Sequence, residues 1–92
     1  MPTDDFLLYQ QEKTVLEVTE VICEAMIQLG ISREKLASLL KMDTKRISAI
    51  LDGSEDATIR TFSDIFTGLN MELACSWRKI NKEHYEMFSK RK

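Results

Sequence analysis

The chain has 92 residues, which is one domain at most, and 43% of them are hydrophobic and 30% charged. This composition is typical of a folded domain, and it excludes intrinsic disorder and a membrane span, which needs about 20 consecutive apolar residues. The net charge of −2 argues weakly against nucleic acid as a partner, but the charges are unevenly distributed.

Positive charge is confined to a central segment and to the C-terminal tail. Residues 32–53 carry five basic and three acidic side chains, and residues 78–92 carry six basic and two acidic ones. Residues 1–31 carry six acids against one base, and residues 54–76 carry four against one. If this protein contacts DNA, we therefore expect the contact through the central segment or the tail.

The first expected element is a helix over residues 14–29. Thr14 and Glu17 have the spacing of a capping box, and Gly30 is a typical residue to end a helix. One or two further helical turns are expected before it, over residues 4–11. Apolar residues recur at spacings of three and four, which places on one helix face Val15, Val18, Ile22, Ala25, Met26 and Leu29. The N-terminal residues lack a basic stretch, so we expect no signal peptide and a cytoplasmic protein without disulfides.

Three shorter helices are expected next, each after a polar N-cap residue. Ser32 precedes the first, Asp43 precedes the second, which ends at Gly53, and Thr58 precedes the third. The third helix carries an apolar stripe that we expect in the core: Ile59, Phe62, Ile65, Phe66 and Leu69.

After Asn70 the hydrophobic pattern changes to strict alternation, which predicts a strand over residues 71–77. No second strand is evident, so this strand is expected to pair with the same strand of a second copy across a two-fold axis. Residues 81–92 are expected to form a last short helix within the basic tail, with Asn81 as its cap and Tyr85 and Phe88 facing inward. The apolar positions of the strand are Met71, Leu73, Cys75 and Trp77.

Few residues could support catalysis or metal binding. Cys23 and Cys75 stand alone among apolar neighbours and are expected to be buried thiols, while His84 is expected at the surface. A metal site would need further ligands. The sequence has no Ser-His-Asp set, no paired carboxylates and no glycine-rich phosphate loop, so we expect no enzyme, no cofactor, no metal and no small-molecule ligand.

Residues 33–52 have the pattern of a helix-turn-helix motif. Ala37 is a small residue in the middle of the first helix, which would allow the second helix to cross it closely. Ser48 and Ala49 are small residues on the second helix. Apolar residues that would seal the crossing occur on both sides of the turn: Leu36, Leu40, Met42, Ile47 and Ile50.

Residues 32–70 resemble the XRE family, the Cro/CI-type helix-turn-helix domains, and align with the family pattern without a gap. The preceding acidic helix and the following strand more loosely resemble the small HigA-type antitoxins. The resemblance implies a mainly all-α fold in one domain over residues 1–92, with five helices and a short C-terminal strand that pairs across a dimer. The matching positions are Leu36, Ala37, Ile47, Ser48, Gly53, Thr61, Ile65 and Leu69.

The resemblance also implies that the second helix of the motif lies in the major groove of double-stranded DNA. Thr44, Lys45 and Ala49 would face base edges, with Ser48 beside them. Arg33 and Arg46 would contact phosphates. The implied protein is a homodimeric transcriptional repressor that recognises a two-fold operator with half-sites about 34 Å apart. As an antitoxin it would also bind a toxin through its acidic N-terminal helix.

Some residues depart from the family pattern and support an alternative, a protein-protein interaction module with weak or no DNA binding. Arg33 and Thr44 replace the usual Gln residues. Lys41 replaces the usual Gly of the turn, where a left-handed conformation would cost about 1–2 kcal/mol. Residues 32–53 could also be a helical pair in a bundle with a solvated basic surface. Carboxylates that would lower affinity for phosphates follow the second helix: Asp52, Glu55 and Asp56.

Overall fold

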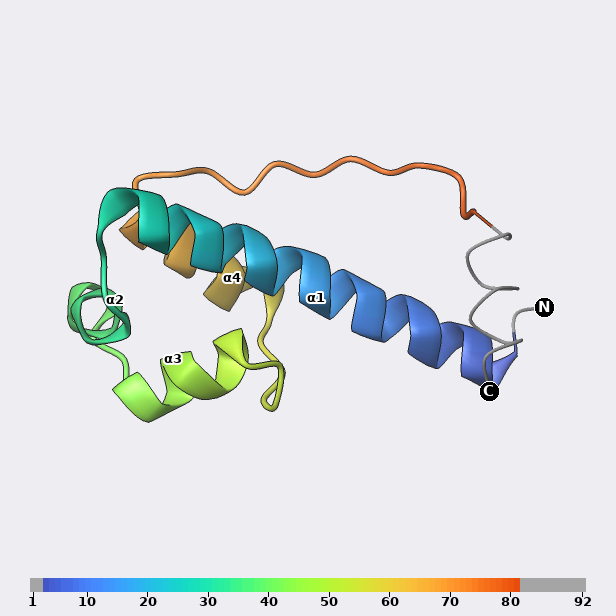
Figure 1. The fold of residues 1–92 in the computed structure, drawn as a ribbon, viewed down its shortest axis with the longest axis horizontal. Coiled ribbons are helices and arrows are strands. Elements are labelled where there is room, and N and C mark those ends of the chain that lie inside the picture. Colours follow the sequence, from blue (N-terminus) through green and yellow to red (C-terminus); the bar gives the residue numbers. More distant parts are fainter. Residues whose placement is uncertain (1–2, 82–92) are drawn as a thin grey trace.

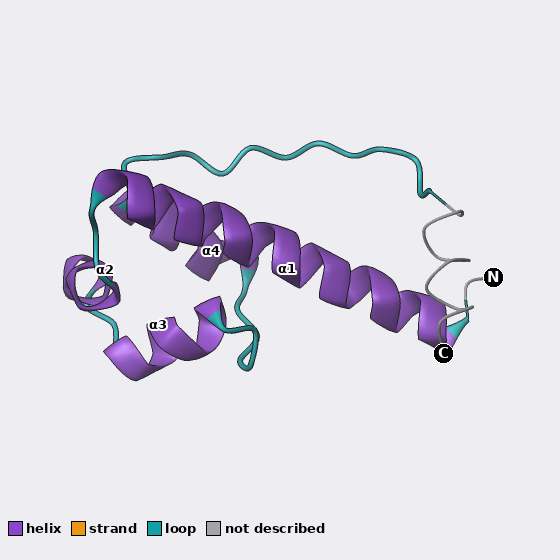
Figure 2. Ribbon diagram, viewed as in Figure 1, coloured by secondary structure: helices purple, strands orange, loops and turns teal. Residues whose placement is uncertain are grey.

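Four helices make up the fold of residues 3–81, which are the residues that the computed structural model describes (Figure 1). Helix α1 is long, and the other three helices gather beside its C-terminal half, so that its N-terminal half extends beyond them (Figure 1). The mainly all-α fold is therefore confirmed for the described residues. None of their helices is both long and apolar enough to cross a membrane. The helices, shown in purple in Figure 2, are α1 (Asp4–Leu29), α2 (Arg33–Leu40), α3 (Thr44–Leu51) and α4 (Ile59–Gly68).

The expected number of five helices is wrong for the described residues, which contain four. Residues 4–11 form the first turns of α1, because no glycine or proline interrupts the chain between Asp4 and Leu29. Thr14 is not the N-cap that was expected, since its hydroxyl donates to the Gln10 carbonyl at 2.9 Å inside the helix. Thr3 caps α1 instead. The short helix expected over residues 81–92 lies outside the described residues, apart from Asn81.

The other expected helix starts are confirmed by their capping hydrogen bonds. Ser32 and Thr58 each accept a bond from the backbone amide three residues later, at 3.0 and 3.1 Å, and Asp43 accepts one from the amide of Lys45 at 2.8 Å. Gly30 ends α1 with a left-handed φ of 66°. These local signals fix where each helix begins, and with it the position of the side chains in its first turn.

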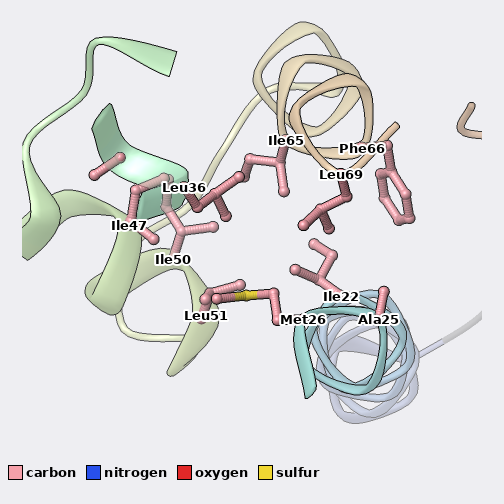
Figure 3. Packing of buried hydrophobic residues seen from close by; sticks show 11 residues of the cluster. Ile22, Ala25, Met26, Leu36, Ile47, Ile50, Leu51, Ile65, Phe66 and Leu69 are labelled. Carbon is pink, nitrogen blue, oxygen red and sulfur yellow. The ribbon is translucent and has the colours of Figure 1, made fainter. Parts of the chain in front are cut away.

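The core lies where α2, α3 and α4 meet the C-terminal half of α1 (Figure 3). Burial of an aliphatic side chain of this size contributes about 1.5–3 kcal/mol, so these residues hold the short helices in place. The expectation that Ile59 lies in the core is wrong, because this side chain is 76% exposed. Ile59 is the first residue of α4, beyond the region of helix contact. Leu29, which was expected on the apolar face of the first helix, is half exposed at the last residue of α1. The largest fully buried side chains are Ile22, Leu36, Ile47, Ile50, Ile65 and Leu69.

The strand expected over residues 71–77 does not form in the described part of the chain. Residues 71–81 instead run back along α1 as an extended segment, on the side away from α3 (Figure 1). The Met71 amide donates to the Phe66 carbonyl at 2.8 Å, but no backbone-backbone hydrogen bond joins residues 72–80 to other described residues. A strand needs a neighbouring strand for its hydrogen bonds, and the described chain supplies none.

One ion pair ties the extended segment to α1. The Arg78 guanidinium lies 3.1 Å from a carboxylate oxygen of Glu17. The side chains of the segment are largely exposed, and Trp77 is 88% exposed. The expectation of two buried thiols is therefore wrong for Cys75, which is exposed, while Cys23 is half-buried. Cys75 lies on the extended segment, where no second strand covers it.

Candidate nucleic-acid interface

Helices α2 and α3 cross steeply: α2 is seen nearly along its axis in Figure 1, whereas α3 lies across the view. Leu36 and Ala37 of α2 are buried in this crossing. Ala37 is 2% exposed, which confirms the close helix contact expected at this small residue. The helices pack as a helix-turn-helix requires, with the second helix projecting from the first.

The turn between the two helices is tight. Lys41 has φ 55° and ψ 43°, so the expected left-handed conformation is confirmed. The next amide, of Met42, donates to the Ala37 carbonyl at 2.9 Å and closes the turn. Asp43 then caps α3 two residues later. The start of α3 is thus fixed by backbone hydrogen bonds on both sides of the turn.

Helix α3 has one buried and one accessible face. Its buried face consists of Ile47, Ile50 and Leu51, which pack into the core (Figure 3). Lys45 and Ala49 are four residues apart and share the opposite face, on which Ser48 also lies. Lys45 is exposed, and Ala49 and Ser48 are half-buried. The three side chains therefore form a short ridge along the outside of the helix.

The remaining expected contact residues flank this ridge. Thr44 is the first residue of α3 and is half-buried, and Arg46 is exposed one helical step from Lys45. Arg33 is the first residue of α2. Its guanidinium donates to Asp52, the C-cap residue of α3, so Arg33 lies near the C-terminal end of α3. The fold thus brings the six expected DNA-binding residues to α3 and to the adjoining start of α2.

Both arginines are paired with carboxylates. The Arg33 Nη2 atom lies 3.1 Å from Asp52 Oδ1, and the Arg46 Nε atom lies 3.9 Å from Glu55 Oε1. All four side chains are more than a third exposed, so these pairs are accessible to solvent and to ligands. Lys45 makes no ion pair with another residue of the described chain. The sequence indicated that Asp52 and Glu55 follow α3, but it gave no sign that they pair with these two arginines.

The outer surface of α3 carries hydrogen-bond donors and a small apolar side chain. Its residues supply a lysine, an arginine, two hydroxyls and a methyl group, which are groups able to donate to base edges and phosphates and to contact a thymine methyl. The helix dipole adds partial positive charge at the N-terminal end, close to Lys45. Within residues 3–81, no cluster of His, Cys, Asp or Glu side chains could hold a metal ion.

Comparison with protein families, with characterised proteins and with solved structures finds no match to this chain.

Proposed function

We propose that this protein is a sequence-specific DNA-binding transcriptional regulator of the XRE family. The observation that carries the proposal is the pair α2 and α3, joined by a tight left-handed turn, with the basic and small side chains of α3 on its outer face. A helix presented in this way fits the major groove, which is wide enough to admit an α-helix. No buried charge or closed cavity is needed for such binding.

In the proposed complex, α3 lies in the major groove with its N-terminal half against the bases. Lys45 donates to guanine O6 or N7, and Ala49 contacts a thymine methyl. Thr44 and Ser48 offer hydroxyls beside them. Arg33 and Arg46 contact phosphates and set the register of α3 in the groove. A complex of this kind that covers a promoter would repress transcription from it, and the promoter could be that of the protein's own gene.

A homodimer would present two copies of α3 to a two-fold operator, with half-sites about 34 Å apart. The extended segment 71–81 supports this proposal, because no backbone hydrogen bond joins its residues 72–80 to the rest of the described chain. Pairing of two such segments, one from each copy, would supply those hydrogen bonds and cover Trp77.

The proposal is tested by selecting duplexes from a random double-stranded library and measuring affinity by fluorescence anisotropy. Lys45→Ala should weaken binding to the selected duplex about 5- to 150-fold, because loss of a base contact costs about 1–3 kcal/mol. Lys13→Ala is the matched control, since it removes the same charge from the N-terminal half of α1, which extends beyond the other helices (Figure 1). Equal effects of the two substitutions would contradict the assignment of α3 as the recognition helix.

A second function, that of a protein-protein interaction module such as a toxin-neutralising partner, is favoured by the exposed apolar side chains of α1. Ile27 is 80% exposed, and Leu7 and Leu8 are about half exposed on the N-terminal half, which extends beyond the other helices (Figure 1). This part of α1 is acidic and could bind a basic toxin. Coexpression with the product of an adjacent gene tests it: a stable complex that recovers no DNA would favour this function.

A further inference from the structure

The two guanidinium groups that are proposed to contact phosphates each form an ion pair with a carboxylate of the same chain. Arg33 donates through Nη2 to Asp52 at 3.1 Å, which is a hydrogen-bonded ion pair. Arg46 lies 3.9 Å from Glu55, which is a looser ion pair. Both acids follow α3 directly, and both arginines flank its outer face. The same donors cannot serve a carboxylate and a DNA phosphate at once.

Backbone hydrogen bonds hold the two acids in place. Asp52 is the C-cap residue of α3, and its amide donates to the Ser48 carbonyl at 2.9 Å. The amides of Ser54 and Glu55 both donate back to the Ala49 carbonyl, at 2.9 and 3.2 Å. The chain after α3 therefore folds over the end of the helix, which keeps the Glu55 carboxylate beside α3.

The arginines are fixed by equally local features. Ser32 caps α2, so Arg33 is the first helical residue and leaves from the end of α2 that lies near Asp52. Arg46 lies in the first turn of α3, behind the Asp43 cap. Each ion pair thus joins two elements whose backbone positions are set independently of the pair. Its exchange for another anion leaves those elements where they are.

We propose that Asp52 and Glu55 act as internal substitutes for DNA phosphates, and that DNA binds only by displacing them from Arg33 and Arg46. The inference rests on the proposed DNA-binding function. Guanidinium groups bind carboxylate and phosphate oxygens through the same N–H donors, so the exchange is chemically matched. Exposed ion pairs are weak, so a phosphate backbone can displace them.

The displaced carboxylates make binding weaker than the arginines alone would allow. Each ion pair must be broken before its arginine can reach a phosphate, so the free energy of the pair is subtracted from that of the phosphate contact. Lys45 has no competing carboxylate in the described chain, so its contact with DNA carries no such cost. The two ion pairs thus reduce the share of the binding free energy that comes from the phosphate contacts of the arginines. They increase the share that comes from the outer face of α3.

The test is the affinity of Asp52→Asn and Glu55→Gln for the selected duplex, measured at one fixed salt concentration. Each substitution should strengthen binding about two- to fivefold, which is the range that corresponds to an exposed ion pair. The effect should be larger for Asp52, whose pair is shorter. Glu20→Gln is the matched control, because it changes the net charge equally on an exposed position of α1 and should leave affinity unchanged.

Double-mutant cycles separate displacement from a general charge effect. In an Arg33→Gln background Asp52→Asn should give no gain, and in an Arg46→Gln background Glu55→Gln should give none. A gain that persists in these backgrounds, or a similar gain from Glu20→Gln, overturns the proposal. Weaker DNA binding and a lower Tm for Asp52→Asn would also overturn it, since they would show that the pair only braces α2 against α3.

The same experiments distinguish refutation of the proposed DNA-binding function from refutation of the ion-pair displacement alone. If no duplex is enriched by selection and neither the wild-type protein nor any variant binds DNA, the DNA-binding function is refuted, and this inference with it. If the wild-type protein binds and Lys45→Ala weakens binding, but Asp52→Asn and Glu55→Gln change nothing, only the inference is refuted.

Discussion

Lys41 and Asn70 are the two residues other than glycine that adopt a left-handed backbone in the described chain, with φ of 55° and 59°. Asn tolerates this conformation better than most residues, because its short polar side chain can bond locally. Lys41 has no such compensation, and it ends α2 at the turn that leads into α3. The turn of the proposed DNA-binding motif therefore has a strained backbone at a single residue, Lys41.

Replacing Lys41 by glycine should relieve this strain. We expect Lys41→Gly to stabilise the protein by about 0.5–1 kcal/mol, because the left-handed penalty of about 1–2 kcal/mol exceeds the entropy that glycine loses on folding. The measurement is the free energy of unfolding in urea. Lys35→Gly is a matched control on the same helix, with the same loss of charge but helical backbone, and it should destabilise by up to about 1 kcal/mol. A loss of stability from both substitutions would contradict the argument.

At the scale of elements, α2 and α4 approach each other closely at Gly68. A Cβ atom added there would lie 3.1 Å from side-chain carbons of both Leu36 and Leu40. Leu36 is fully buried, and 3.1 Å is shorter than an ordinary contact between carbon atoms. The absence of a side chain at Gly68 thus lets α4 lie close against α2.

Gly68→Val should therefore force α4 away from α2 and destabilise the fold by about 1–3 kcal/mol, the usual cost of overpacking a core. Thermal and urea unfolding measure this directly. Thr67→Val places the same side chain one residue earlier, at an exposed position, and should change stability by less than about 0.5 kcal/mol. Equal stability of the two variants would mean that the contact between α2 and α4 is looser than these distances indicate.

The elements were predictable from sequence where their signals are local. Ser32, Asp43 and Thr58 cap helices because each side chain bonds an amide two or three residues away, and such spacing is visible in the sequence. Thr14 shows the limit: it has the capping-box spacing, but nothing ends the preceding helical turns, so the helix continues through it.

The outer face of the candidate site was predictable and its ion pairs were not. The helical spacing of apolar residues in α3 is enough to predict that Ile47 and Ile50 face the core and that Lys45 faces outward. The contact between Arg33 and Asp52 joins residues 19 positions apart in the sequence, and it exists only because α2 crosses α3 at one particular angle. Sequence periodicity carries no information on that angle.

At the scale of the whole molecule, the distribution of exposed apolar side chains is uneven. The three short helices bury their apolar faces against the C-terminal half of α1, whereas the extended segment 71–81 leaves Trp77 88% exposed and Ile80 half exposed. The alternating pattern that predicted a strand is present, but a lone extended segment cannot form a ladder. A second copy of the same segment would satisfy both the backbone and these side chains, in an isologous interface.

We therefore expect proline within this segment to dissociate the proposed dimer while the helices remain folded. Successive amides of an extended chain point to opposite edges, so one of Ala74→Pro and Cys75→Pro removes a donor from the open edge. Sedimentation equilibrium of the wild-type protein at micromolar concentration should give twice the monomer mass of 10.7 kDa. One of the proline variants should give the monomer mass with unchanged helical circular dichroism, because residues 74 and 75 lie outside every helix. Ala74→Thr, which favours a strand and keeps the amide, should remain dimeric. A monomeric wild-type protein, or two proline variants that both keep the mass of a dimer, would rule out this segment as the dimer contact.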